Sequence, residues 1–166
     1  FYEGAVVAGY PSDATDNAVQ ANITAAGYGT DGAGPSTGPL HAVGAGKCLD
    51  VPNSSTTAGT QTDIRGCSGA AGQTWTHTSS GTLTVYSGST QLCLDASGRG
   101  TANGTKAIVW TCNGQANQQW NLNADGTVTG VQSGLCLDVT GAATADGTPV
   151  ELWTCNGGSN QQWRLG

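Results

Sequence analysis

The sequence predicts an all-β fold in which three repeats close into a threefold object. Glycine supplies 27 of the 166 residues and only 10% of residues are charged, a composition that suits many tight turns. The six cysteines form three consecutive pairs, with 19 positions between the members of each pair. A tryptophan follows the first cysteine of each pair by 27 positions. Two intervals that recur three times indicate a repeat architecture.

Each repeat opens and closes on the same short motif. Cys-Leu-Asp stands at residues 48–50, 93–95 and 136–138, and Gln-x-Trp stands at 73–75, 118–120 and 161–163. Gly-Thr turns at 59–60, 104–105 and 147–148 lie between the two motifs. Further turns at 80–81 and 125–126 precede β-rich runs, which is typical of hairpins. A longer loop is expected at 86–91, because the first two repeats are 45 positions apart and the next two are 43 apart.

The third repeat lacks a β-rich run after its Gln-x-Trp motif, and the front of the chain supplies one. Residues 38–43 lie ten positions before Cys48, just as residues 126–131 lie ten before Cys136. We therefore expect the first and last repeats to complete each other. The domain would span 38–166, with repeats at about 38–80, 81–125 and 126–166.

One repeat is too short to bury a core alone, so the three repeats should share one. We expect the Gln-x-Trp tryptophans and the Cys-Leu-Asp leucines in it: Trp75, Trp120, Trp163, Leu49, Leu94 and Leu137. Equal spacing predicts disulfides within each repeat, Cys48 with Cys67, Cys93 with Cys112 and Cys136 with Cys155, each worth about 3 kcal/mol. With no C-x-x-C motif and two histidines, we expect no metal site and no cofactor.

The charge pattern excludes some partners. The net charge is −6 and the five Lys and Arg residues are scattered singly, so no basic patch for nucleic acid is expected. No apolar stretch reaches the roughly 20 residues of a membrane span. No signal peptide is recognisable, and we interpret the chain as a mature product or a fragment.

With these motifs, residues 38–166 resemble the ricin-B-type lectins, also called family 13 carbohydrate-binding modules. The tripled Cys-Leu-Asp and Gln-x-Trp patterns carry the resemblance. It implies a β-trefoil with twelve strands, six in a short barrel and six in a hairpin cap. It also implies one sugar pocket per repeat, in which an aromatic face packs on the sugar ring and polar side chains bond its hydroxyls.

The resemblance implies unequal pockets. The third repeat supplies the whole family set, which is Asp138, Glu151, Trp153, Asn160 and Gln161. The second supplies Asp95, Trp110, Asn117 and Gln118, with Ile108 at the polar position. The first keeps Asp50 and Gln73 but has Asp63, Arg65 and Gly72 at the other positions. We expect the first pocket to be weak or inactive.

Structural roles compete with sugar binding at several of these positions. The three aspartates could instead cap turns, although we favour sugar binding for Asp95 and Asp138. The glutamines could fasten local backbone as readily as contact sugar. Trp110 and Trp153 precede Thr-Cys in weakly hydrophobic surroundings, and we favour exposure and stacking for both.

Residues 1–28 lie outside the repeats and residues 29–37 have a linker composition. A helix is predicted at 12–26. Residues 3–23 resemble the end of the catalytic domain of the arabinofuranosidase B type of glycoside hydrolase, family 54. That resemblance implies Asp13, in Tyr-Pro-Ser-Asp-Ala-Thr, as general acid. Retaining glycosidases need a second carboxyl group, which would lie upstream. The alternative for Asp13 is a charge that favours a helix N-terminus.

Together these patterns predict a secreted, extracellular, monomeric carbohydrate-binding module from a hydrolase that acts on hemicellulose or on arabinose-, galactose- or xylose-containing polysaccharide. Its partner would be a polysaccharide or glycan, and the chain alone would not be an enzyme. Two alternatives remain: a fragment of an α-L-arabinofuranosidase that retains part of its active site, and a trefoil that contacts or inhibits another protein. Sequons occur at Asn22, Asn53 and Asn103, and they matter only in a eukaryotic secretory host.

Overall fold

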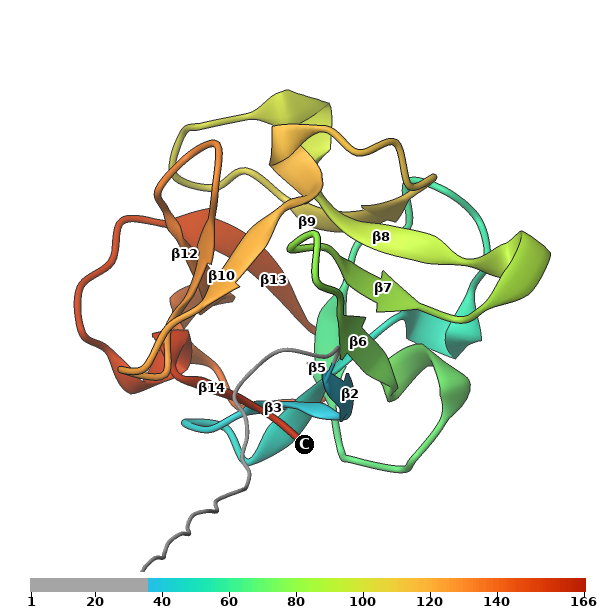
Figure 1. Cartoon of the computed structure of the whole chain (residues 1–166). Coiled ribbons are helices and arrows are strands. Elements are labelled where there is room, and N and C mark those ends of the chain that lie inside the picture. Colours follow the sequence, from blue (N-terminus) through green and yellow to red (C-terminus); the bar gives the residue numbers. More distant parts are fainter. Residues whose placement is uncertain (1–35) are drawn as a thin grey trace, which may run out of the picture. The chain divides into compact units, whose positions relative to one another are not determined.

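Four strands in each repeat build the domain, which the computed structural model describes for residues 36–166. The first repeat contains β3 (Leu40–Ala42), β4 (Lys47–Asp50), β5 (Asp63–Arg65) and β6 (Trp75–His77). The second contains β7 (Leu83–Val85), β8 (Leu92–Ala96), β9 (Ala107–Trp110) and β10 (Trp120–Leu122). The third contains β11 (Val128–Gly130), β12 (Cys136–Val139), β13 (Thr148–Trp153) and β14 (Trp163–Leu165). Figure 1 shows the repeats as three lobes around a common centre.

Short 3₁₀ helices recur at matching places. One follows the second strand of each repeat: η2 (Pro52–Ser54), η5 (Ser97–Arg99) and η7 (Thr140–Ala142). Another precedes the last strand: η3 (Ala71–Gln73), η6 (Ala116–Gln118) and η8 (Ser159–Gln161). One more, η4 (Gly88–Thr90), lies in the extra loop predicted between the first two repeats. No helix within residues 36–166 is long and apolar enough to cross a membrane.

The barrel closes through the first and last repeats, as the sequence predicts. Strand β14 pairs antiparallel with β3, so that Leu165 faces Leu40, and Gly166 donates its N–H to the carbonyl of Pro39 (2.8 Å). The other barrel pairs are β6 with β7 and β10 with β11.

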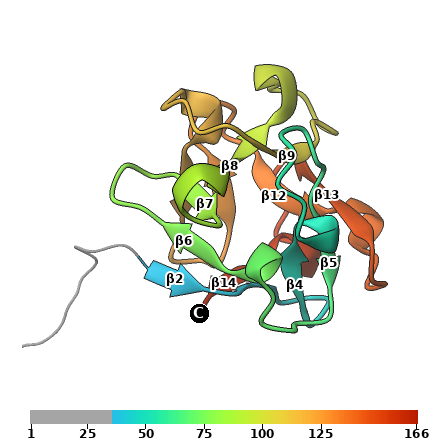
Figure 2. The ribbon, with the colours of Figure 1, turned by 90° about the vertical axis from the view of Figure 1, so that its right-hand side faces the viewer.

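An additional strand, β2 (Ser36–Gly38), pairs with β6. It lies beside the carboxyl-terminal strand β14 in both views (Figures 1 and 2). Ser36 and Thr37 were expected in the linker, and their pairing with His77 and Thr76 places them in the sheet instead. The rest of that linker, the predicted helix at 12–26 and Asp13 lie outside the described residues.

The three cap hairpins, β4–β5, β8–β9 and β12–β13, join through the Gly-Thr turns. Gly59 donates its N–H to Val109 (2.7 Å), Gly104 to Leu152 (2.8 Å) and Gly147 to Ile64 (2.8 Å). The φ angles of these glycines are 96°, 90° and 88°, a region that side chains disfavour. The motif that looked like a local turn therefore also links neighbouring repeats.

The predicted core is confirmed. Trp75, Trp120, Trp163, Leu49, Leu94 and Leu137 are all buried in one cluster. Each of the three indole N–H groups donates to the carbonyl of the leucine 26 residues earlier, at 3.0, 2.9 and 2.9 Å. The buried tryptophans thus keep a hydrogen bond in an apolar interior.

The disulfides join Cys48 to Cys67, Cys93 to Cys112 and Cys136 to Cys155, as the spacing predicts. Each ties the second strand of a repeat to the loop beyond the third strand. The loop after the third strand is therefore anchored to the second strand at the same position in every repeat.

Candidate functional site

The candidate pockets lie on the cap hairpins, where strand register brings the predicted residues together. In the third repeat Asp138 faces Glu151 across β12 and β13, and Cys136 faces Trp153. Side chains two positions apart on a strand share a face, and directly opposed residues are close neighbours. Asp138, Glu151 and Trp153 therefore converge, and all three line one pocket of about 490 Å³.

The same register builds the pocket of the second repeat. Asp95 faces Ile108, and Cys93 faces Trp110. Asp95, Ile108 and Trp110 line a pocket of about 430 Å³ together with Asn117. Trp110 is 44% exposed and Trp153 is 40% exposed, so both indoles are available to a ligand, as expected.

In the second and third repeats an asparagine of the pocket lining hydrogen-bonds the backbone next to the aspartate. Asn160, at η8, donates through Nδ2 to the carbonyl of Val139 (3.0 Å), and Asn117, at η6, donates to that of Ala96 (3.3 Å). Each bond ties the 3₁₀ helix before the last strand to the residue that follows the pocket aspartate. The Oδ1 atom of Asn117 is buried and has no hydrogen-bond partner within the described residues.

The glutamines lie behind the aspartates. Gln161 is fully buried, and its Nε2 donates to Asp138 Oδ2 (2.8 Å) and to the carbonyl of Thr154 (3.0 Å). Its Oε1 accepts from the N–H of Asn156 (2.9 Å). Both donor hydrogens are therefore committed to the protein, and Gln161 is absent from the pocket lining.

Gln118 repeats this arrangement in the second repeat. It donates to Asp95 Oδ2 and to the carbonyl of Thr111, both at 2.9 Å, and accepts from the N–H of Asn113 (2.9 Å). It is also absent from the pocket lining. Each glutamine holds the Oδ2 atom of its aspartate, and the aspartate lines the pocket.

Burial sets the ionisation of the pocket acids. It raises the pKa of Asp95 and of Asp138, and the hydrogen bonds from Gln118 and Gln161 oppose that rise. Burial also raises the pKa of Glu151, and the charge of Asp138 adds to the rise. The second pocket holds one acid and the third holds two acids that face each other.

The first repeat keeps a pocket of about 350 Å³, but its lining differs from that of the other two, because its aspartate is already paired with an arginine. Arg65 takes the place of the exposed tryptophans, opposite Cys48. It reaches Asp50 (Nε to Oδ2, 3.3 Å) and Asp63 (Nη2 to Oδ2, 3.3 Å). Asp63 lies opposite Asp50, and burial together with a hydrogen bond to Asp50 raises the pKa of Asp63 to about 6.

Two further differences affect the first pocket. Gln73 bonds the N–H of Ser68 and the carbonyl of Gly66, and no bond to Asp50 is present in the described residues. A Cβ atom at Gly72 would lie 2.9 Å from the carbonyl oxygen of Val51. An asparagine therefore does not fit there without a backbone shift.

One cluster of potential metal ligands occurs in residues 36–166, formed by His41, Cys48 and Cys67. Its two sulfur atoms form a disulfide, so they are not thiolate ligands. Asp13, the expected general acid, lies outside the described residues.

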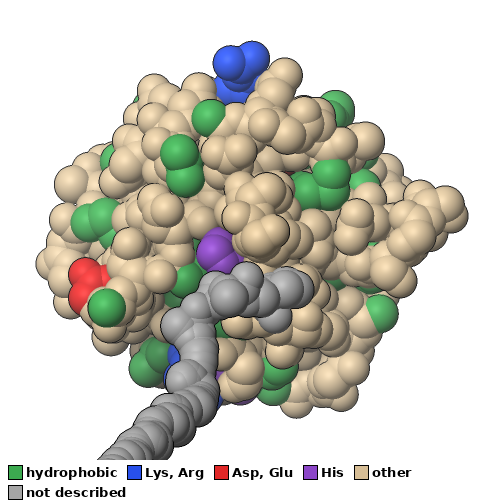
Figure 3. Space-filling model, in the orientation of Figure 1, with side chains coloured by type: hydrophobic (Ala, Val, Ile, Leu, Met, Phe, Trp, Pro, Cys, Tyr) green, Lys and Arg blue, Asp and Glu red, His purple; other side chains and the backbone are tan. Residues whose placement is uncertain are grey.

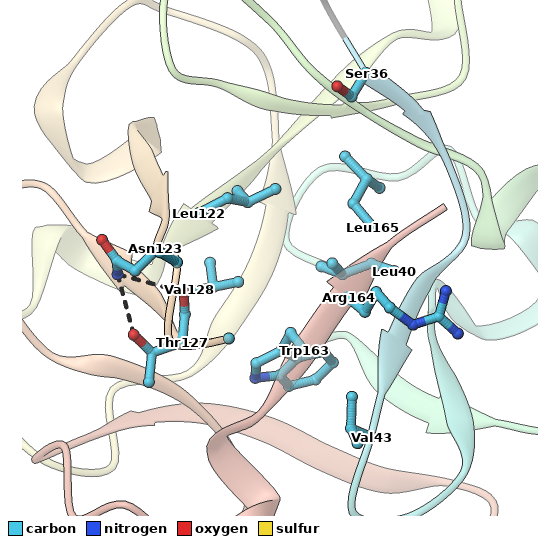
Figure 4. Close-up of a pocket in the computed structure, with 12 residues that line it drawn as sticks. Ser36, Leu40, Val43, Leu122, Asn123, Thr127, Val128, Trp163, Arg164 and Leu165 are labelled. Carbon is cyan, nitrogen blue, oxygen red and sulfur yellow. Dashed lines mark hydrogen bonds between the residues drawn. The ribbon is translucent and has the colours of Figure 1, made fainter. Parts of the chain in front are cut away.

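An apolar pocket of about 470 Å³ lies elsewhere, at the barrel (Figure 4). Leu40, Leu122, Val128, Trp163 and Leu165 line it. Asn123 and Thr127, two polar residues of its lining, bond each other. It lacks the acid and exposed indole of the cap pockets.

Sequence reasoning missed the turn that forms one wall of each cap pocket. In the second repeat this wall is Ser97, Gly98 and Arg99, and in the third it is Thr140, Gly141 and Ala142. Aligning the repeats on Cys-Leu-Asp would have placed these residues together and shown that Arg99 matches Ala142.

Comparisons with known proteins confirm both resemblances. Residues 36–163 match the ricin-type β-trefoil lectin domain, and the chain therefore belongs to that family. Residues 1–29 match the catalytic domain of α-L-arabinofuranosidase B.

Several curated relatives carry that enzyme's name. A probable α-L-arabinofuranosidase B of Aspergillus fumigatus is 44% identical over 85 residues, which are 51% of this chain and 16% of the relative. An arabinofuranosidase/β-xylosidase of Trichoderma koningii is 57% identical over 44 residues, 26% of this chain and 8% of the relative. The chain thus spans a small part of these relatives.

Solved structures support the fold. The designed threefold-symmetric protein ThreeFoil is 34% identical with a TM-score of 0.68, covering 77% of this chain and 96% of that one. An exo-β-1,3-galactanase from Clostridium thermocellum is 26% identical with a TM-score of 0.68, covering 78% of this chain and 30% of that one.

Proposed function

We propose that residues 36–166 bind sugar units of a polysaccharide or glycan through the pockets of the second and third repeats. One observation carries the proposal: each pocket sets a half-exposed indole beside an aspartate held by a buried glutamine. An indole face suits the apolar face of a pyranose, and a carboxylate oxygen accepts strong hydrogen bonds from hydroxyls. In this proposal the glutamines position the aspartates, and the asparagines and Glu151 add polar contacts.

The relatives suggest where such binding would be used. Several of them are named α-L-arabinofuranosidase B, and residues 1–29 resemble the end of that catalytic domain. We infer that the chain is part of a secreted glycoside hydrolase in which the lectin domain follows the catalytic domain. The lectin domain would direct the enzyme to hemicellulose or to another arabinose-, galactose- or xylose-containing polysaccharide.

Titration of the full chain with methyl β-D-xyloside and methyl α-L-arabinofuranoside tests the binding proposal. Trp153→Ala and Asp138→Ala should lower affinity at the third pocket, the former by about threefold to tenfold through lost stacking. Asp50→Ala should leave binding unchanged, because Arg65 already occupies that carboxylate. Val131→Ala is the matched control, since Val131 is 46% exposed and lies in none of the three cap pockets. Asp50→Ala as the most damaging change would contradict the ranking.

Two other functions are distinguished by simple assays. If the chain is an active arabinofuranosidase fragment through Asp13, it should release reducing sugar from arabinoxylan, and Asp13→Asn should abolish that release. If the trefoil instead contacts or inhibits a protein, a glycan array should give no signal. The two acid-plus-indole pockets favour the sugar-binding function over both alternatives.

A further inference from the structure

The pockets of the second and third repeats share lining residues at equivalent positions and differ at two positions that carry charge. Asp95, Trp110 and Asn117 match Asp138, Trp153 and Asn160 in repeat position. The turn after the aspartate is also the same, because Arg99 and Ala142 both adopt left-handed backbone, with φ angles of 58° and 57°. The backbone of the two pockets is therefore the same here, and the side chains that vary on it determine how the charge of the two pockets differs.

The variable residues make the lining of the second pocket neutral and that of the third pocket acidic. In the second pocket, Arg99 and Asp95 are the charged members of the described lining, which is therefore neutral overall. In the third pocket, Asp138 and Glu151 are the charged members, and no cation accompanies them in the described lining. Glu151 takes the place of Ile108, so a single exchange between equivalent strand positions adds the second acid.

Arg99 has no partner within the domain. The ion pairs among residues 36–166 involve Lys47 and Arg65, and Arg99 is not among them. Its side chain is exposed at the pocket wall. A guanidinium presents a planar fork of N–H donors that matches a carboxylate. Asn117 lies in the same lining, where its Nδ2 donates to the carbonyl of Ala96 (3.3 Å).

From this difference we infer that the pocket of the second repeat prefers a uronic acid unit, while the pocket of the third repeat disfavours it. A uronic acid combines a ring for Trp110, hydroxyls for Asp95, and a carboxylate for Arg99. The same carboxylate in the third pocket would approach two like charges, which is unfavourable. This inference rests on the proposed sugar binding and adds a division of labour between the two pockets.

The test compares two sugars that differ at one carbon, methyl β-D-glucuronide and methyl β-D-glucoside. The full chain is titrated and followed through the indole N–H signals in NMR spectra. The signals of Trp110 and Trp153 report the two pockets separately. The buried indoles of Trp75, Trp120 and Trp163 donate to backbone carbonyls and serve as internal controls.

We expect the glucuronide to bind at Trp110 about twofold to fivefold more tightly than the glucoside, the range of an exposed ion pair. At Trp153 the order should be reversed. Raising the salt concentration should reduce both differences, because exposed charges are screened.

Arg99→Ala should abolish the preference at Trp110 without disturbing the fold, since Ala142 occupies the equivalent backbone. The double change Ala142→Arg with Glu151→Ile should create the preference at Trp153. Equal binding of both sugars at Trp110, or a preference that survives in Arg99→Ala, would overturn the inference and leave the proposed function intact. If neither sugar perturbs either signal while methyl β-D-xyloside does, the inference fails and the proposed function stands; if none of the three perturbs a signal, the proposed function fails as well.

Discussion

At the scale of single residues, buried amide side chains hold the pocket aspartates in place. Gln161 and Gln118 each bond one aspartate oxygen and two backbone groups. The sequence could not separate a sugar contact from a local fastening role for these glutamines. Their hydrogen bonds support the fastening role. The sequence could not show this, because each glutamine bonds an aspartate 23 residues earlier in the chain.

Replacing Gln161 with glutamate should therefore destabilise the domain in a pH-dependent way. The change removes the donors to Asp138 and Thr154 and sets two carboxylates together. We expect a loss of unfolding free energy of about 2–4 kcal/mol at pH 7, in line with unsatisfied buried polar groups. The loss should shrink near pH 4, where one acid takes a proton. Gln132→Glu, at an exposed position, is the control in chemical denaturation, and an equal effect there would contradict the role of Gln161.

The acid pair of the first repeat makes a second pH prediction. Burial, with the hydrogen bond to Asp50, raises the pKa of Asp63 from 3.8 to about 6. The folded state thus holds this proton more tightly than the unfolded chain, so the stabilisation is present below pH 3.8 and is lost as pH rises through 6.

Thermal unfolding at pH 4 and pH 7 measures that contribution. The gain in melting temperature on acidification should be smaller in Asp63→Asn than in the native chain, because asparagine cannot titrate. Asp125→Asn gives a comparison of opposite sign, since hydrogen bonding to Thr127 lowers the pKa of Asp125. A gain that is unchanged in Asp63→Asn would show that this acid does not carry the effect.

At the scale of elements, the repeated hairpin could be predicted from the sequence, and the contacts that it makes with other side chains and with the next hairpin could not. The repeat spacing predicted the disulfide pairing and the core tryptophans, and the weakly hydrophobic surroundings of Trp110 and Trp153 predicted that both are exposed. It did not predict that Arg65 bridges Asp50 and Asp63, or that Gly104 bonds the hairpin of the next repeat. These contacts depend on which residues lie opposite each other across strands and between repeats, and the spacing of motifs along the sequence does not give that pairing.

The turn glycines at the joins between hairpins offer a test of backbone strain. Gly104 has a φ angle of 90°, and a Cβ atom added there would meet no heavy atom within 4 Å. Gly104→Ala should therefore cost about 1–2 kcal/mol through backbone strain alone. Gly66→Ala is the matched control, because Gly66 also has open space and lacks a positive φ angle. Urea denaturation should separate the two variants, and equal stabilities would contradict the strain argument.

At the scale of the whole molecule, the shared core fixes the pockets relative to one another. Trp75, Trp120 and Trp163 belong to one buried cluster, and the cap hairpins are joined by backbone hydrogen bonds between repeats. The charged side chains on the face in Figure 3 are few and scattered. Binding to a polymer should therefore depend on the number of pockets engaged rather than on long-range charge.

The proposed sugar binding by two pockets on one rigid body predicts avidity for a branched or insoluble polysaccharide. Once one pocket is engaged, binding at the second becomes intramolecular, and avidity can exceed single-site affinity by about 10²-fold or more. Retention on insoluble arabinoxylan should be compared for the native chain, Asp95→Ala, Asp138→Ala and the double variant. Each single variant should lose most of its retention and keep its affinity for monosaccharide at the surviving pocket. A single variant that binds the polymer as tightly as the native chain would mean that one pocket is sufficient, and the multivalent model would be wrong.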